Sequence, residues 1–377
     1  MSQRGPTLEA VYAEARDGGY GFVASNLTQF DILQGLLDGA AAAGSDVVLQ
    51  VKRDTAAYLG NGDVAAGLDL VGAHLRALAD PLPVAAFLNV DHVDPDDEEL
   101  LAAAVESDAP DSIMVDASDE PFETNVERTA AVIERVEAAG NDLLVEAELG
   151  TIRGTESGET TTDAFYTDPE EAVAFVDRTG CDLLAVSIGT EHGVSAGVDL
   201  DLRVDLAAEI GVALRDHGFD VPLVVHGSSG LSPEQVSALM ETDVCKLNTN
   251  TRYQYEYART ACEFYHDNAD AILPPDGVAD DRTTFFADAE WAPDKSRFDP
   301  RVVGTTIHER IAAVYADLAA VVGSAGRSAG TATSAGNATS DGTTSDGTTS
   351  DGTTSDGTTS DGTTSDGTTS DGTATDE

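Results

Sequence analysis

Eight short apolar segments alternate with helix-like segments between residues 20 and 248, and this alternation leaves few possible folds. The segments are rich in Val, Ile, Leu and Ala and have no alternating polar face, as in parallel strands that are covered on both sides. We expect the strands at residues 20–25, 46–51, 84–92, 112–116, 143–148, 182–189, 222–226 and 244–248. Because short loops and helices join them, the chain is predicted to be an α/β protein with a (β/α)8 TIM barrel.

Helical segments are expected before, between and after these strands. They lie at residues 8–15, 32–43, 65–79, 96–107, 121–139, 169–178, 204–217, 232–242, 252–269 and 306–322. The last two have no strand after them, so we expect these extra C-terminal helices to pack outside the barrel or at a subunit contact. A Pro- and Asp-rich loop is expected between them at residues 270–300.

The composition changes sharply at residue 323. We assign residues 1–322 to the barrel domain and 323–377 to a disordered, low-complexity acidic tail. Six copies of Ser-Asp-Gly-Thr-Thr fill residues 340–369, and they contain no large apolar residue that could offset the entropy lost on ordering. A Ca²⁺-binding repeat is the alternative, because Asp recurs every five residues, but it lacks bulky residues on which to fold.

The chain is strongly acidic, with a formal net charge of -49 at pH 7. Its only lysines are Lys52, Lys246 and Lys295. Such a surface repels nucleic acid and anionic membranes, so neither is expected as a partner. The composition is typical of a halophilic protein adapted to molar salt, where like charges are screened. Binding of a polycation is the less favoured alternative.

Three features point to the cytoplasm. The three cysteines are an odd number without metal-like spacing, which argues against a disulfide framework. Residues 1–5 lead into a helical pattern without the features of a signal peptide. No apolar run approaches the length that crosses a membrane.

Polar side chains follow several of the predicted strands. Asp91 and His92 end the third, His192 follows the sixth, and His226 ends the seventh. Because active sites of such barrels lie at the carboxyl ends of the strands, these imidazoles are expected to converge there. Three imidazoles suit Zn²⁺, which keeps a fourth position open in catalytic sites. The alternative of three unrelated loop histidines fits less well, because acids stand on the intervening strand ends.

Further acids and one lysine occupy neighbouring strands. Asp116 and Glu148 end the fourth and fifth strands, where they could hold a second cation or orient the imidazoles. Glu146 lies two residues before Glu148 and therefore faces the same side. Lys246 in the eighth strand is expected to pair with Glu146 in the core, although a catalytic role for either remains open.

Two Gly-, Ser- or Asn-rich segments are candidates for binding phosphate. Residues 226–230, His-Gly-Ser-Ser-Gly, follow the seventh strand, and residues 248–251, Asn-Thr-Asn-Thr, follow the eighth. Such loops present backbone N–H groups and hydroxyls to anions, and barrels often bind phosphate after their last strands.

Taken together, these motifs resemble those of the class II, metal-dependent fructose-bisphosphate aldolases. The resemblance extends from about residue 8 to 318 and rests on motifs in the same order and at similar spacing, at residues 91–92, 145–150, 189–193, 226–230 and 246–251. It implies a zinc-containing barrel that reversibly joins dihydroxyacetone phosphate to an aldehyde. For fructose 1,6-bisphosphate that aldehyde is glyceraldehyde 3-phosphate, a reaction of glycolysis and gluconeogenesis.

The resemblance also implies a role for each candidate residue. The zinc ligands are His92, His192 and His226, and the positions for a second divalent cation are Asp116 and Glu148. Asp91 is the acid that protonates the aldehyde oxygen during condensation, and Glu156 is the base that removes the α-proton of the ketone. We assign substrate binding to Asn26, Gly193, Gly227, Ser228, Ser229, Asn248, Thr249, Asn250 and Thr251. The family often also uses a monovalent cation, and we expect a homodimer or higher homo-oligomer.

The chain departs from the family pattern on the side that meets the aldehyde. A Ser usual after the second strand is replaced near Lys52 and Arg53, and Asn250 stands where Asp is common. The usual arginine for the distal phosphate is missing, so Lys52, Arg53 or Arg301 is expected to substitute for it.

Three alternatives to this function remain open. The chain could act on a related ketose bisphosphate such as tagatose bisphosphate, which differs at one stereocentre. Lys246 could serve as the nucleophile of a Schiff-base aldolase. Finally, the barrel could bind metal without catalysis and act as a scaffold, although Asp91 and the three histidines argue against this.

Overall fold

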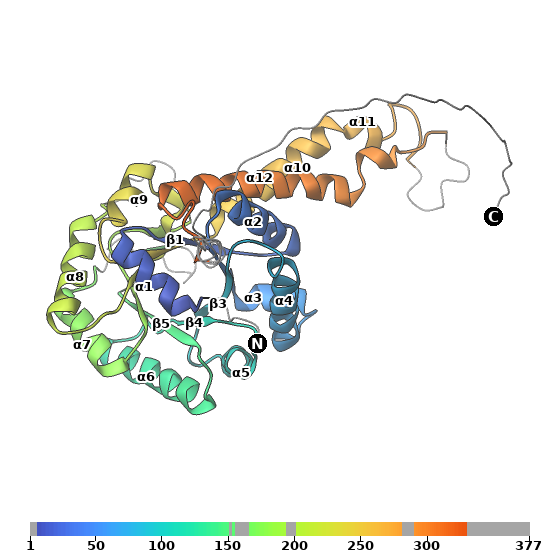
Figure 1. Ribbon diagram of the computed structural model, residues 1–377. Coiled ribbons are helices and arrows are strands. Elements are labelled where there is room, and N and C mark those ends of the chain that lie inside the picture. The colour runs from blue at the N-terminus through green and yellow to red at the C-terminus, as the bar shows by residue number, and fades with distance from the viewer. Residues whose placement is uncertain (1–5, 151–152, 155–165, 194–200, 281–289, 330–377) are drawn as a thin grey trace, which may run out of the picture. The chain divides into compact units, whose positions relative to one another are not determined.

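The computed structural model describes residues 6–329 except 151–152, 155–165, 194–200 and 281–289. Eight parallel strands form a closed barrel in the order β1-β10-β9-β7-β5-β4-β3-β2, which confirms the predicted TIM barrel (Figure 1). Their bounds are β1 Phe22–Asn26, β2 Val47–Val51, β3 Ala86–Val93, β4 Ser112–Val115, β5 Leu144–Leu149, β7 Leu183–Val186, β9 Leu223–Val225 and β10 Val244–Thr249. Two short strands, β6 Arg153–Gly154 and β8 Glu191–His192, pair in a separate sheet.

Helices surround the barrel, as expected from the alternating pattern. They are α1 Leu8–Gly18, α2 Phe30–Ala43, α3 Arg53–Leu59, α4 Val64–Ala79, α5 Glu98–Glu106, α6 Phe122–Ala139, α7 Pro169–Thr179, α8 Val204–Asp216, α9 Pro233–Leu239, α10 Thr251–Asp267, α11 Ala269–Ile272 and α12 Pro300–Val321, with 3-10 turns η1 Ser228–Gly230 and η2 Lys295–Arg297. Helix α3 was not expected from the sequence. Helix α12 begins at Pro300 and not at residue 306, because Asp299 caps it by accepting a hydrogen bond from the backbone N–H of Arg301.

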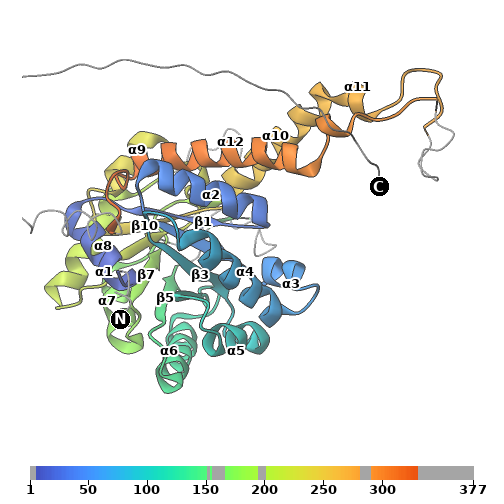
Figure 2. The same cartoon turned by 45° about the vertical axis from the view of Figure 1, so that its right-hand side comes forward.

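The long helix α12 lies along α2 on the outside of the barrel (Figure 2). Glycines on α2 permit this close packing: a Cβ atom at Gly35 would lie 2.6 Å from the side chain of Ile311, and one at Gly39 would lie 2.7 Å from the carbonyl oxygen of Ala312. The extra C-terminal helix therefore depends on the absence of side chains at two positions of α2.

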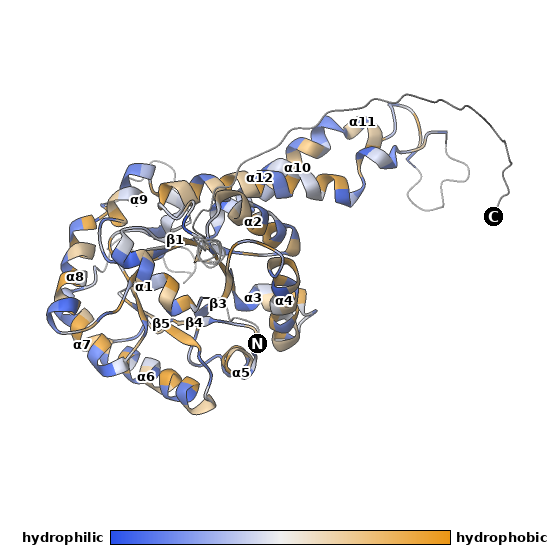
Figure 3. Ribbon diagram, viewed as in Figure 1, coloured by the Kyte–Doolittle hydropathy of each residue, from blue (hydrophilic) through white to orange (hydrophobic). Residues whose placement is uncertain are grey.

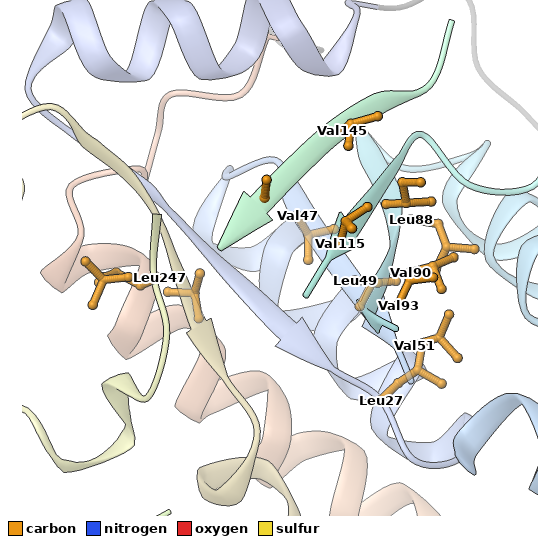
Figure 4. Packing of buried hydrophobic residues seen from close by; sticks show 14 of the residues in the cluster. Leu27, Val47, Leu49, Val51, Leu88, Val90, Val93, Val115, Val145 and Leu247 are labelled. Atoms are coloured by element: carbon orange, nitrogen blue, oxygen red, sulfur yellow. The ribbon is translucent and has the colours of Figure 1, made fainter. Parts of the chain in front are cut away.

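The core lies between the strands and the surrounding helices. The strands are largely apolar, whereas the helices carry polar residues as well (Figure 3). Leu49, Leu88, Val90 and Val115 are fully buried and pack together between neighbouring strands and helices (Figure 4). Removing such surface from water is the main stabilising contribution to the fold.

The amino-terminal end of the barrel is closed by α1. Its buried residue Tyr12 packs edge-to-face on Phe22 of β1, with ring centroids 6.4 Å apart, and Phe87 and Cys245 belong to the same apolar cluster. With this end filled by side chains, the polar residues gather at the opposite, carboxyl-terminal end of the strands. In the described part of the chain, no helix is both long and apolar enough to cross a membrane.

Residues 323–329 pack against the barrel, although the sequence assigned them to the tail. The backbone N–H groups of Gly326 and Ser328 donate to the carbonyls of Ala43 and Gly44, at 2.9 and 3.0 Å. The buried carboxylate of Asp46 accepts hydrogen bonds from the Ser328 hydroxyl and from the backbone N–H of Ala329. Small polar side chains make these contacts, so hydrophobic pattern did not reveal them. The predicted disorder and the Ca²⁺-binding alternative for the repeats concern residues outside the described part.

We predict that two truncations separate this segment from the repeats. A chain that ends at Ala329 should keep its free energy of unfolding within about 0.5 kcal/mol of the full chain. A chain that ends at Val322 should lose about 2–4 kcal/mol, because hydrogen bonds are removed and buried Asp46 loses two donors. Chemical denaturation of both at the same salt concentration measures the difference, and equal stability of the two would show that residues 323–329 contribute nothing.

Candidate active site

Polar residues from many strand ends line one pocket at the carboxyl-terminal end of the barrel. The lining residues are Asn26, Lys52, Asp91, His92, Gly193, His226, Gly227, Ser229, Asn248, Asn250 and Thr251. Most of the predicted site residues that can be placed are therefore brought together. Ser228 and Thr249 do not line this pocket: their hydroxyl oxygens lie 2.9 Å apart, and Ser228 also donates to the carbonyl of Asn248, so they support the loop from behind.

An irregularity in β3 brings two consecutive side chains to the pocket. In a regular strand, neighbouring residues point to opposite faces. Here the pairing of β3 with β4 shifts its register between Val90 and Val93. His92 has a φ of 52°, a left-handed conformation that non-glycine residues rarely adopt. This local strain allows Asp91 and His92 both to reach the pocket.

Asp91 is 1% exposed and is held by side-chain amides from three strands. Asn26 donates to its Oδ2 at 2.8 Å, Gln50 donates to its Oδ1 at 3.1 Å, and Asn248 lies 3.4 Å from Oδ1. Burial acts to raise the pKa of Asp91, but the neighbouring His92, whose Nδ1 lies 3.0 Å from Oδ1, and then Lys52 hold it well below its usual value. The amides therefore surround an ionised carboxylate. The role of Gln50 was not predicted from the sequence. The only indication there was a polar residue within an otherwise apolar strand.

Two overlapping groups of side chains could hold a divalent cation. Asp91, His92 and His226 form one, and His92, Asp116 and Glu148 form the other; in each, the ligand atoms lie within 4.8 Å of one another. The rings of His92 and His226 have centroids 5.0 Å apart. Imidazole nitrogens with carboxylate oxygens form a donor set that Zn²⁺ accepts. Because Asn26 and Gln50 donate to the two oxygens of Asp91, and Nδ1 of His92 lies 3.0 Å from its Oδ1, Asp91 is less suited than the imidazoles to bind the cation.

Glu148 supplies a further reason to expect a cation. Its side chain is 2% exposed, and its Oε2 accepts no hydrogen bond within the described structure. Burial, followed by repulsion from Asp116, raises the pKa of Glu148 well above its usual value. Ser118 lies beside both acids, at 2.7 Å from Asp116 and 3.4 Å from Glu148. A bound divalent cation would compensate these two carboxylates, so the residues present fit a metal centre.

Beneath His226 lies the ion pair expected from the sequence. Lys246 donates from Nζ to Oε2 of Glu146, which confirms that the two residues pair in the core. The other oxygen of Glu146, Oε1, lies 2.9 Å from Nε2 of His226, a contact that the sequence did not suggest. Lys246 is 1% exposed and does not line the pocket, which argues against its use as a Schiff-base nucleophile.

Two predicted residues cannot be placed fully. The backbone of His192 belongs to β8, where it pairs with Gly154 of β6, but its side chain lies outside the described part of the structure. Glu156 lies outside it entirely. Their roles as zinc ligand and base stay predictions. Gly193, next to His192, does line the pocket.

Backbone groups dominate one side of the pocket. Gly227 has a φ of 69°, and a Cβ atom there would lie 2.4 Å from the carbonyl oxygen of Glu191, so only glycine fits. It leads into η1, where Ser229 faces the pocket. Asn250 and Thr251 stand at the start of α10, whose N-terminal N–H groups favour an anion. This side is therefore suited to a phosphate.

Only one of the three basic residues proposed for the distal phosphate lines the pocket. Lys52 does so at the start of α3, near Asp91. Arg53 instead pairs with Asp97 at 2.6 Å. Arg301 pairs with Asp299 at 2.8 Å in the first turn of α12 and is exposed.

Comparisons with known proteins show the family of this chain and its fold. The model of the family described as fructose-bisphosphate aldolase class-II matches residues 6–327. The D-tagatose-1,6-bisphosphate aldolase subunit GatY of Klebsiella oxytoca is 33% identical over 258 residues, covering 68% of this chain and 84% of that protein. A fructose-bisphosphate aldolase of Staphylococcus epidermidis is 29% identical over 268 residues, covering 71% and 88%. The crystal structure of fructose-bisphosphate aldolase from Campylobacter jejuni shares the fold, with a TM-score of 0.71, 22% identity, and coverage of 85% and 95%.

We predict that alanine variants of the two consecutive residues in β3 differ in zinc binding. His92→Ala should weaken zinc binding strongly, because both candidate ligand groups contain His92. The loss should exceed the roughly 10–100-fold that follows when a residue that only hydrogen-bonds to a metal ligand is removed. Asp91→Ala should change it much less, because amides occupy the oxygens of Asp91. Competition titration with a zinc chelator measures both affinities. If Asp91→Ala weakens zinc binding as much as His92→Ala does, Asp91 is itself a ligand.

Proposed function

Because the chain belongs to the class II fructose-bisphosphate aldolase family, we propose that it is a zinc-dependent aldolase that reversibly cleaves fructose 1,6-bisphosphate to dihydroxyacetone phosphate and glyceraldehyde 3-phosphate. The observation that carries this proposal is the position of Asp91. An ionised carboxylate held by amides lies beside the candidate metal ligands, in a pocket whose other side is suited to phosphate.

The metal centre would be held by His92, His192 and His226, with Asp116 and Glu148 available to a second divalent cation. A monovalent cation is part of the same proposal. When bound, zinc would polarise the ketone of the substrate and stabilise the negative charge that develops when the carbon–carbon bond breaks.

Proton transfer would fall to two carboxylates. In the cleavage direction, Asp91 accepts the proton of the hydroxyl that becomes the aldehyde oxygen, and in condensation it returns that proton. The ionised state of Asp91 suits the first of these steps. Glu156 is proposed to exchange the α-proton of dihydroxyacetone phosphate, a step in which Asp91 takes no part.

Binding of the ketone phosphate would use the other side of the pocket. We assign it to Gly193, Gly227, Ser229, Asn250 and Thr251, which line the pocket where N–H groups and hydroxyls are available. Ser228 and Thr249 act indirectly by supporting these loops. Asn26 is assigned to orienting Asp91, because its amide donates to the carboxylate at 2.8 Å, and Asn248 is assigned to the contact between Asp91 and His226.

A second candidate substrate is tagatose 1,6-bisphosphate. The observation that favours it is the 33% identity to the Klebsiella protein, which is named for that sugar. The two sugars differ at one stereocentre. Cleavage assays with both, with and without chelator and combined with metal analysis, test the proposal as a whole. Loss of activity without metal supports it, whereas cleavage of neither sugar would leave a metal-binding scaffold as the better interpretation.

The cellular setting follows from the same proposal. A metabolic enzyme of glycolysis and gluconeogenesis would act in the cytoplasm on small phosphorylated sugars, as a homodimer or higher homo-oligomer. The net charge of -49 supports adaptation to molar salt, where the Debye length falls to about 3 Å and repulsion among carboxylates is screened. The cleavage assays should therefore be run in high salt.

Removal of the Asp91 carboxylate should separate two steps of the reaction. Asp91→Ala is expected to slow cleavage of the sugar by roughly 10²–10⁴-fold, the usual contribution of a general acid–base group. Exchange of the α-proton of dihydroxyacetone phosphate with solvent should persist, because Glu156 is assigned to that step. Both rates are measured on the same zinc-loaded protein. Equal losses in both would contradict the division of roles.

Lys52 is predicted to bind the distal phosphate of the sugar. Lys52→Ser should lower kcat/KM for fructose 1,6-bisphosphate by about 10–100-fold relative to fructose 1-phosphate, which lacks that group, because a charge-assisted contact is lost. Arg53→Ser is the matched control: Arg53 pairs with Asp97 outside the pocket and should leave the ratio unchanged. An unchanged ratio in Lys52→Ser would exclude this role.

A further inference from the structure

The buried pair of Glu146 and Lys246 has a position that pairing alone does not explain. Lys246 uses Oε2 of Glu146, and the second oxygen, Oε1, approaches the imidazole of His226 at 2.9 Å. The side chains of all three residues are at most 2% exposed. Replacing a buried ion pair by apolar residues is often neutral or stabilising, so stability gives little reason for this arrangement.

We propose that Glu146 and Lys246 act as positioning residues that fix the tautomer of His226. Glu146 accepts the hydrogen of Nε2, so Nδ1 keeps its lone pair for the divalent cation. This inference rests on the proposed zinc centre, in which His226 is a ligand, and it adds the groups that present His226 to the metal.

The direction of the ring supports this assignment. Its Nε2 faces Glu146, whereas its Nδ1 lies 3.6 Å from Oε2 of Glu148, one of the candidate ligands. A neutral imidazole has one protonated nitrogen and one with a lone pair. With hydrogen on Nε2, the lone pair points toward Glu148. With hydrogen on Nδ1, the lone pair of Nε2 would instead face the carboxylate of Glu146 at 2.9 Å, a closer repulsion than that between Nδ1 and Glu148 at 3.6 Å in the other tautomer.

The amide of Asn248 does not decide between the two tautomers. Its nitrogen Nδ2 lies 2.9 Å from the same Nε2 atom of His226 and 3.4 Å from Oδ1 of Asp91. With hydrogen on Nε2, the amide would turn its oxygen toward His226, and Asp91 would keep Asn26 and Gln50 as its donors. An amide can present either its oxygen or its nitrogen after a half-turn of the side chain, so it adapts to either tautomer. A carboxylate can only accept. The fixed partner is therefore Glu146, whose other oxygen is held in place by the hydrogen bond from Lys246.

The test is the double variant Glu146→Gln with Lys246→Met in the full chain. The introduced glutamine can accept or donate and the introduced methionine carries no charge, so neither selects a tautomer, while the volume of the core is nearly kept. We expect the variant to fold, with zinc affinity reduced roughly 10–100-fold, as for other partners of metal-binding histidines. Competition titration with a chelator measures the affinity, and thermal unfolding of the metal-free protein reports the fold.

A second pair, remote from the pocket, provides a matched control. Glu256 is 4% exposed and accepts hydrogen bonds from Arg310 at 3.1 and 3.2 Å, between α10 and α12. The double variant Glu256→Gln with Arg310→Met also removes a partly buried ion pair. Its zinc affinity should equal that of the wild-type protein, because neither residue approaches a metal ligand.

A measurement of the tautomer in the wild-type protein tests the inference without an activity assay and without requiring that the variant folds. In metal-free wild-type protein with ¹⁵N-labelled histidine, long-range ¹H–¹⁵N correlations should show hydrogen on Nε2 of His226. In the double variant of Glu146 and Lys246, both tautomers should be populated. Hydrogen on Nδ1 in the wild-type protein would overturn the inference, as would a folded double variant whose zinc affinity stays within about threefold of wild type.

Failure of this inference can be distinguished from failure of the proposed function. If the wild-type protein binds zinc and cleaves a ketose bisphosphate but the double variant keeps its affinity, only the positioning role is wrong. If the wild-type protein neither binds zinc nor cleaves the sugars, the proposed function is wrong.

Discussion

The structure depends on one constraint, the closure of eight largely apolar parallel strands into a barrel that helices surround. Parallel strands all end on the same side of the barrel, and α1 fills the other side with Tyr12. Polar residues that the core cannot hold are therefore collected at a single rim. Closure thus brings together residues that are far apart in sequence, such as Asn26 and Asn248, around Asp91.

Three buried carboxylates at or beneath this rim are compensated in three different ways. Asp91 accepts hydrogen bonds from amides and lies 3.0 Å from Nδ1 of His92. Glu146 pairs with the ammonium of Lys246. Glu148 has a weak donor in Ser118 and a second acid, Asp116, beside it. The carboxylate with the least internal compensation lies where the imidazoles converge, and this difference makes the place suited to a cation. In the proposed reaction, Asp91 therefore transfers a proton and Glu148 lies where a cation binds.

Some of the structure could be read directly from residue patterns. Continuous apolar runs gave the eight strands, and polar residues at their ends gave the pocket, because both signals are local. Two less regular features were not predicted. Helix α3 is short, and residues 323–329 are held by backbone groups and small polar side chains. Neither leaves the periodic apolar pattern on which such predictions depend.

The sequence by itself determined the barrel and the family resemblance, because the apolar strands and the motifs at their ends are local patterns. It suggested that Glu146 and Lys246 pair but left a catalytic role for either open. Only the tertiary structure decided that Gln50 supports Asp91, that Lys52 and not Arg53 or Arg301 lines the pocket, and that Glu146 also reaches His226. The physical reason is that these facts depend on side-chain direction and on distances between strands that are not neighbours in sequence. A pattern along one chain does not contain those distances, and closure of the barrel sets them.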